Sequence, residues 1–228
     1  MSSTAELPRP WTLSGVALRS QPFKQPFANL LGHLCAHPPQ HALFLNMLSL
    51  LEHMGSRKIM LSQMRNPLTQ DTLKHMAEET RHAYFFKRQA EKLAGRSFDG
   101  YRVENTLCPG AARMYFGRLD SLITAETASD GKPDAPYLWV SLIIELRACW
   151  TYRLYQMALQ NAGSALSLKS ILAEEDRHME DMYESLQTAD PRAEKRLKKL
   201  SAIECTLFGK FLGQLERTVM ARERENAA

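Results

Sequence analysis

The hexapeptide AEETRH at Ala77–His82 returns, with one substitution, as AEEDRH at Ala173–His178. Each copy contains the pattern Glu-x-x-His, and the four residues concerned are Glu79, His82, Glu175 and His178. Residues i and i+3 of an α-helix lie on one face, with Cβ atoms about 5–6 Å apart. Each pair can therefore bind a metal ion, provided that the flanking sequence is helical and that other helices supply further ligands.

The segments around both copies have the periodicity of helices, with apolar residues about every 3.6 positions and no convincing strand-like alternation. Asn66-Pro67 is expected to end the first helix, and Thr69 or Asp71 to cap the second. Gly95 marks the end of the second helix, and Asp190-Pro191 the start of the last. The sequence thus predicts an all-α protein with helices over residues 41–64, 69–93, 111–127, 137–159, 164–188 and 190–226.

The chain of 228 residues is long enough for one sizeable core, and a single domain is predicted. Residues 1–39 are expected to form an irregular N-terminal arm on the body, with at most a helical turn or two at Phe27–Cys35. Residues 40–188 are expected to form a helical bundle, in which a long crossover over 96–136 joins two hairpins. Pro109-Gly110 and Ser129–Pro133 supply turn signals in that crossover. Residues 190–226 are expected to form an additional C-terminal helix.

The predicted helices over residues 41–64 and 137–159 each contain a single acidic residue, Glu52 and Glu145 respectively. Glu145 lies in the apolar stretch SLIIELRACW, where an unpaired buried carboxylate costs several kcal/mol. Glu79 follows Glu52 by 27 residues, and Glu175 follows Glu145 by 30. This spacing places each single glutamate at about the height of the Glu-x-x-His pair in its hairpin.

Both single glutamates are followed by two small residues after the same interval, Gly55-Ser56 and Ala148-Cys149. Small side chains at that distance, one helical turn along, leave room beside the glutamates for a small molecule.

This arrangement resembles the ferritin-like di-iron carboxylate superfamily, whose pattern is Glu, Glu-x-x-His, Glu, Glu-x-x-His on four successive helices. The resemblance covers roughly residues 41–188 and implies a four-helix bundle with one long crossover. It implies two iron ions, Fe/Fe or Mn/Fe, since four carboxylates and two imidazoles suit two divalent cations. The implied ligands are Glu52, Glu79, His82, Glu145, Glu175 and His178. The alternative is that both Glu-x-x-His pairs lie on helix surfaces, which leaves Glu145 unexplained.

Two further residues extend this predicted site. His75 shares a face with Glu79 and is similar to an extra ligand of the arylamine N-oxygenase branch, although that branch carries it on the fourth helix, where this chain has Ile171. The alternative is a non-ligating histidine beside the site or partly exposed. Asp181, one turn beyond His178, either accepts a hydrogen bond from an imidazole N–H or is solvated.

Glu78 and Glu174 precede the ligand glutamates by one position, about 100° around the helix. We expect both on the outer face, paired with Arg81 and Arg177 at i+3.

The stretch SLIIELRACWTYRLY resembles the third helix of cyanobacterial aldehyde-deformylating oxygenases. The resemblance implies a non-haem di-iron oxygenase or oxidase that uses O2 on a small hydrophobic or carrier-tethered organic substrate, with electrons from a separate reductase. The alternatives are a rubrerythrin-like peroxidase, a ferroxidase or iron-binding protein, and a non-catalytic helical scaffold. The chain contains no C-x-x-C electron-transfer module.

Charge, hydropathy and cysteine spacing limit the other functions and locations that the sequence allows. A formal net charge of +4 is too small to indicate nucleic-acid binding. No apolar run approaches about 18 residues, and no secretory signal is evident, so we expect no membrane span. The four cysteines lie far apart without a C-x-x-C pair, so we expect a reducing cytoplasm. The C-terminal helix, with its periodic apolar residues, either packs on the bundle or forms a homodimer, and packing on the bundle is the preferred interpretation.

Overall fold

The computed structural model describes residues 15–62, 68–128 and 135–227, which form eight helices and no β-strand, so the all-α prediction is confirmed for them. The predicted stop at Asn66-Pro67 and the predicted turn at Ser129–Pro133 lie outside the described residues. None of the described helices is both long and apolar enough to span a membrane. The helices are α2 (Val16–Arg19), α3 (Gln21–Ala36), α4 (Pro38–Ser62), α5 (Gln70–Ala94), α6 (Pro109–Thr127), α7 (Ala135–Asn161), α8 (Lys169–Ala189) and α9 (Ala193–Ala227).

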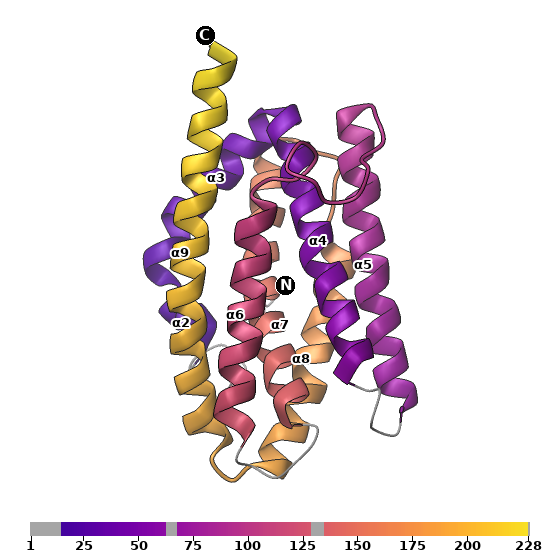
Figure 1. The fold of residues 1–228 in the computed structure, drawn as a ribbon, viewed down its shortest axis with the longest axis vertical. Coiled ribbons are helices and arrows are strands. Elements are labelled where there is room, and N and C mark those ends of the chain that lie inside the picture. The colour runs from indigo at the N-terminus through magenta and orange to yellow at the C-terminus, as the bar shows by residue number, and fades with distance from the viewer. Residues whose placement is uncertain (1–14, 63–67, 129–134, 228) are drawn as a thin grey trace, which may run out of the picture.

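The long helices run along a common axis and pack in pairs (Figure 1). Helices α4 and α5 form one hairpin with extensive mutual contact, and α7 and α8 form the other. Helix α6 lies in the connection between the hairpins and packs against α4, α7 and α9. The predicted order of hairpin, crossover, hairpin and final helix is therefore observed, and α9 packs on the bundle as expected.

The ends of α5 follow the capping residues that the sequence predicts. Thr69 caps α5, because its hydroxyl oxygen accepts the backbone N–H of Thr72 at 3.1 Å. Gly95 ends the same helix at φ 64°, a left-handed conformation that glycine adopts without a Cβ clash. The predicted start of α8 at Ser164 was wrong by five residues. The chain instead turns at Gly163, and the backbone N–H of Leu168 donates to the Gln156 side chain at 2.6 Å.

The N-terminal arm is more regular than expected, since α2 and α3 occupy most of residues 16–36. Helix α3 tolerates an internal Pro26, and its apolar side chains form one buried stripe against α7 and α4. That burial outweighs the lost backbone hydrogen bond of the proline. The buried side chains of the stripe are Phe27, Leu30, Leu31 and Leu34.

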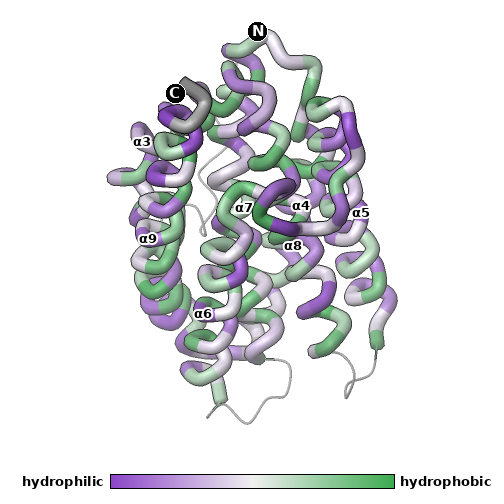
Figure 2. The backbone as a smooth tube through the Cα atoms, turned by 45° about the horizontal axis from the view of Figure 1, so that its top comes forward, coloured by the Kyte–Doolittle hydropathy of each residue, from purple (hydrophilic) through white to green (hydrophobic). Residues whose placement is uncertain are grey.

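Helices α4 and α7 form the centre of the molecule and are buried over most of their length. The outer helices are amphipathic, and Figure 2 shows hydrophobic and hydrophilic segments alternating along α9. Glu52 of α4 and Glu145 of α7 are only 6% and 4% exposed, so both single carboxylates lie in the interior.

A buried ion pair fastens α9 to α7. The Arg147 guanidinium donates to both carboxylate oxygens of Glu204 at 2.7 Å, and Glu204 is fully buried. The Tyr115 hydroxyl of α6 donates to the same carboxylate, also at 2.7 Å. The Arg147 guanidinium also stacks 3.7 Å from the ring centre of Phe208. Three helices therefore meet at one desolvated charge pair.

Removal of one charge from this pair should destabilise the fold strongly. We expect Glu204→Gln to lower the free energy of unfolding by about 3–5 kcal/mol, because Arg147 stays buried without a counter-charge. Glu126→Gln is the matched control, since it removes a surface pair with Lys199 between α6 and α9, worth about 0–1 kcal/mol. Chemical denaturation of both variants measures the difference, and equal losses would contradict this role of the buried pair.

A buried histidine in α4 should make stability depend on pH. Burial lowers the pKa of His41 from 6.5 to about 4, and its Nε2 is hydrogen-bonded to the Tyr155 hydroxyl. Because the folded state binds the proton less readily than the unfolded state, this contribution is present above pH 6.5 and is lost as the pH falls through about 4. The loss amounts to about 3 kcal/mol.

The measurement is the free energy of unfolding of the wild type and of His41→Gln across this pH range. The two curves should converge towards acid. Parallel curves would show that His41 does not titrate as the structure requires.

Candidate metal centre

The six predicted ligands meet in the interior of the molecule, and His75 joins them. They form two groups in which ligand atoms of all members lie within 4.8 Å of one another, and every member is buried. Glu79 belongs to both groups, so the groups are adjacent. The first contains Glu52, Glu79, His82 and Glu175, and the second contains His75, Glu79, Glu145 and His178.

The first group joins α4, α5 and α8. Nδ1 of His82 lies 3.0 Å from Oε1 of Glu175 and 3.8 Å from Oε1 of Glu79. Glu52 accepts a hydrogen bond from the hydroxyl of Tyr152, which reaches in from α7. The i, i+3 spacing of Glu79 and His82 therefore directs both side chains to one point, as the sequence predicted.

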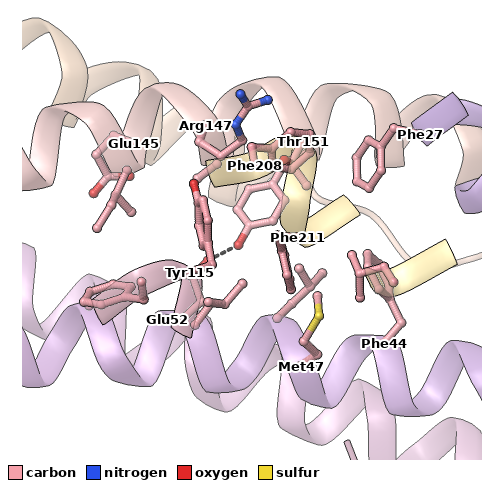
Figure 3. Close-up of a pocket in the computed structure, with 18 of the residues that line it drawn as sticks. Phe27, Phe44, Met47, Glu52, Tyr115, Glu145, Arg147, Thr151, Phe208 and Phe211 are labelled. Carbon is pink, nitrogen blue, oxygen red and sulfur yellow. Dashed lines mark hydrogen bonds between the residues drawn. The ribbon is translucent and has the colours of Figure 1, made fainter. Parts of the chain in front are cut away.

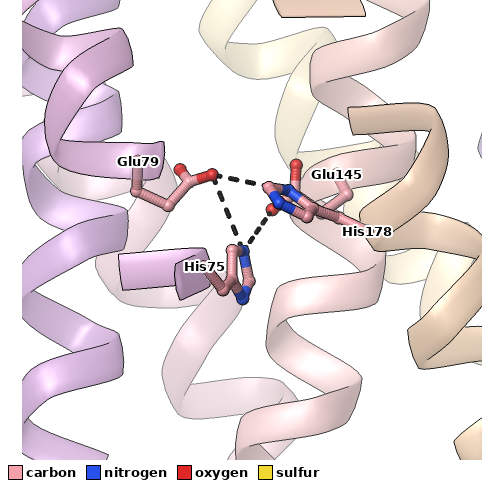
Figure 4. A group of neighbouring side chains, drawn as sticks. All are labelled: His75, Glu79, Glu145 and His178. Atoms are coloured by element: carbon pink, nitrogen blue, oxygen red, sulfur yellow. Dashed lines mark hydrogen bonds and ion pairs between the residues drawn. The ribbon is translucent and has the colours of Figure 1, made fainter. Parts of the chain in front are cut away.

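The second group joins α5, α7 and α8 (Figure 4). Nε2 of His75 lies 3.1 Å from Oε1 of Glu145 and 3.6 Å from Oε1 of Glu79. Nδ1 of His178 lies 3.9 Å from Oε1 of Glu79 and 3.2 Å from Oε2 of Glu175. Glu79 and Glu175 thus lie between the two histidines His82 and His178, where bridging carboxylates are expected.

Three buried polar atoms at the centre of the site have no hydrogen-bond partner among the described residues. They are Glu79 Oε1, His82 Nδ1 and Glu175 Oε1. The latter two are 3.0 Å apart but lack hydrogen-bond geometry. A buried polar atom without a partner costs about 1–3 kcal/mol, so three converging ones are an unfavourable arrangement unless a cation occupies the space between them. The donor set of carboxylates and imidazoles fits such a cation.

The electrostatics of the site lead to the same conclusion. Burial, reinforced by the neighbouring carboxylates Glu79 and Glu175, raises the pKa of Glu52 and Glu145 well above its ordinary range. Burial opposes the charge on His75, but its hydrogen bond with Glu145 and the nearby carboxylate of Glu79 raise its pKa to about 12. The site therefore holds protons that offset the charge of its carboxylates, and divalent cations would displace them.

The structure corrects the expected outer-face position of Glu78 and Glu174. Glu78 is 7% exposed, and its Oε2 accepts from Nε2 of His178 at 2.7 Å. Glu174 is half-buried, and its Oε2 accepts from Nε2 of His82 at 2.8 Å. The prediction was wrong because it considered each helix alone. Packing of α5 on α8 turns both glutamates towards the opposite helix.

Each copy of the hexapeptide therefore supports the other. The first glutamate of one copy holds Nε2 of the histidine of the other copy, which orients the ring and turns Nδ1 towards Glu175, where a metal would bind. Arg81 pairs with Glu174 at 2.5 Å and lies 4.0 Å from Glu78, while Arg177 lies 3.9 Å from Glu78. The arginines thus balance the charge of the supporting glutamates from the exposed side.

Sequence reasoning did not single out the roles of Tyr137 and Tyr152. The Tyr137 hydroxyl lies 3.1 Å from Nδ1 of His75, the nitrogen that faces away from Glu145. Asp181 lies exposed beside the site, and the hydrogen bond considered for it is made by Glu78 instead. No sequence signal separates these two tyrosines from the other aromatic residues of α7.

An apolar cavity of about 70 Å³ adjoins the carboxylates of the site (Figure 3). Glu52, Glu79 and Glu145 contribute to its wall, and α3, α6 and α9 close it with aromatic side chains. Gly55 and Ala148 line it as expected, whereas Ser56 bonds to Thr80 and Cys149 lies outside its lining. The aromatic side chains are Phe27, Phe44, Tyr115, Phe116, Tyr152, Phe208 and Phe211.

A polar groove of about 570 Å³ reaches the other side of the site. His75, Glu78 and His178 form part of its wall, and Tyr137 and Asp181 also line it. The carboxylates thus face an apolar cavity, while the imidazoles of the second group face a polar opening.

No protein-family model, curated protein or solved structure matches this chain. The interpretation of the site therefore depends on its own geometry.

The crosswise hydrogen bonds predict that the glutamates on the opposite helix control metal affinity. We expect Glu78→Ala to weaken binding of a divalent metal by about 10–100-fold, because His178 loses the acceptor that orients it. Asp176→Ala is the matched control, since Asp176 adjoins Glu175 but pairs with Arg153 at 2.6 Å on the exposed side of α8. Competition with a chromophoric chelator measures both affinities. A similar loss in the two variants would contradict the crosswise arrangement.

Proposed function

We propose that this protein is a ferritin-like, non-haem di-iron oxygenase or oxidase, which uses O2 to oxidise a small apolar organic substrate. The observation that carries the proposal is the pair of buried ligand groups that share Glu79 and adjoin an apolar cavity. The order of two helix hairpins joined by a long crossover supports a ferritin-like bundle.

The ligands divide naturally between two ions. Glu52 and His82 would hold one ion, and Glu145 and His178 the other, with His75 as an additional ligand of the second. Glu79 and Glu175, which lie between His82 and His178, would complete the ligand sets. When bound, a redox-active pair, Fe/Fe or Mn/Fe, supplies the electrons that reduce O2 and accepts those removed from the substrate.

The protein's own residues exclude water and hold protons. The aromatic side chains around the cavity keep bulk water from the carboxylates, which strengthens the electrostatic interactions inside. The Tyr152 hydroxyl holds a proton at Glu52, on the edge of the cavity. Glu78 and Glu174 keep the Nε2 protons of the two ligand histidines in place.

The cavity limits the substrate by its size and polarity. A volume of about 70 Å³ accommodates O2 together with a narrow apolar group, whereas drug-sized ligands need about 300–1,000 Å³. A small hydrophobic molecule, or the end of a carrier-tethered chain, meets this limit. A separate reductase would supply the electrons.

The polar groove favours a second candidate, a ferroxidase or peroxidase. Hydrated Fe²⁺ or peroxide would approach through the groove, which His75, Glu78 and His178 line, and would not need the apolar cavity. A non-catalytic scaffold is supported less well, because it leaves the three partnerless buried atoms of the site unexplained.

Anaerobic loading with Fe(II) tests the proposal first. We expect about two irons per chain in the wild type, O2 uptake by the reduced protein, and loss of both in Glu145→Ala. Glu104→Gln, which alters an exposed glutamate, is the control and should behave as the wild type. Absence of stoichiometric metal in the wild type would overturn the di-iron assignment.

A second variant separates oxygenase from ferroxidase or peroxidase. Ala148→Phe would fill the cavity beside the carboxylates without changing a ligand. If an apolar substrate uses the cavity, this variant retains iron but loses substrate-coupled O2 consumption. Unchanged coupling to an apolar substrate would contradict the cavity as its binding site, and unchanged Fe²⁺ oxidation alone would favour the ferroxidase.

A further inference from the structure

A third group of metal-ligand side chains lies away from the buried centre. It contains His33 in the last turn of α3, His37 directly after that helix, and Glu223 near the end of α9. One ligand atom of each residue lies within 4.8 Å of the others. The histidines are four residues apart, and their rings stack with centres 4.0 Å apart at 22°. None of the three residues belongs to the ligand groups described above.

The hydrogen bonds of this group leave Nε2 of both histidines available to bind a metal ion. Nδ1 of His37 donates to the backbone carbonyl of His33 at 2.7 Å, so Nε2 of His37 carries a free lone pair. Such a bond to the second nitrogen also orients a metal-bound imidazole. Nε2 of His33 is buried and has no hydrogen-bond partner among the described residues, although it lies 3.2 Å from Oε1 of Glu223.

We propose that His33, His37 and Glu223 form a second metal site, which binds a borderline transition ion such as Zn²⁺. Two imidazoles and one carboxylate, with a fourth position open to water, are a ligand set that tetrahedral Zn²⁺ uses. The mixture of nitrogen and oxygen ligands disfavours Mg²⁺ and Ca²⁺, which prefer oxygen ligands alone.

The site would join two parts of the chain that are far apart in sequence. His37 is the residue between α3 and α4, whereas Glu223 lies in the last two turns of α9. Helix α9 also contributes Phe208, Phe211 and Leu215 to the wall of the apolar cavity. A bound ion would therefore link the C-terminal turns of α9, a helix that lines the cavity, to the end of α3.

The test uses the full chain after anaerobic loading with Fe(II), followed by equilibrium dialysis against Zn²⁺ and metal analysis. We expect the wild type to bind one additional Zn²⁺ per chain, and His37→Gln to bind it at least tenfold more weakly. His53→Gln is the matched control, because His53 is a partly exposed histidine of α4 outside all three groups. It should retain the additional ion.

Hydrogen exchange provides a second measurement that does not depend on the buried centre. Zn²⁺ should slow amide exchange in the last turns of α9 in the wild type, and His37→Gln should abolish this effect although His37 lies outside α9. The proposal is overturned if His37→Gln retains full Zn²⁺ affinity, or if His53→Gln loses as much. It is also overturned if bound Zn²⁺ leaves exchange in α9 unchanged.

Discussion

The rest of the structure depends on the burial of four carboxylates around one point. Glu52, Glu79, Glu145 and Glu175 are each at most 6% exposed, and such groups cannot all be charged in a low-dielectric interior without counter-charges. Protons and nearby imidazoles provide part of the compensation. Glu79 Oε1 and Glu175 Oε1 still have no hydrogen-bond partner among the described residues, and under the proposed function divalent cations would interact with them.

Each hexapeptide supplies the hydrogen-bond acceptor that orients the histidine of the other. A histidine that binds metal through Nδ1 needs an acceptor for its Nε2 proton, and its own helix does not supply one at the right height. Glu174 supplies it to His82, and Glu78 supplies it to His178, across the contact between α5 and α8. The arginine within each copy then balances a glutamate at the exposed edge. Four of the five identical positions in the repeat, namely both glutamates, the arginine and the histidine, are thereby explained by charge and geometry, whereas the site does not explain the shared alanine.

The sequence predicts the fold class, the hairpin order and the ligand set because these follow from local patterns. Periodicity places Glu79 and His82 on one face, and an isolated charge such as Glu145 in an apolar helix indicates a buried polar site. The orientation of Glu78 depends on how α5 meets α8, which no local pattern encodes. The same limit applies to Tyr152. In the sequence it is one of several aromatic residues of α7, and only the packing of the helices brings its hydroxyl to Glu52. The length of helix α3 was underestimated because Pro26 argues locally against a helix. Burial of its apolar stripe against α7 stabilises the helix despite the proline.

The site is asymmetric in a way that bears on its chemistry. Glu52 and Glu145 line an apolar cavity of about 70 Å³, whereas His75 and His178 line a polar groove of about 570 Å³. O2 and apolar groups partition into the first environment, and water, protons and hydrated ions into the second. A reaction that oxidises an apolar group needs both, since protons must arrive without water flooding the side where the substrate lies. The buried carboxylates lie between the closed cavity and the polar groove, which would meet this requirement under the proposed function. The cavity, more than the set of proposed ligands, would then distinguish an oxygenase from a ferroxidase.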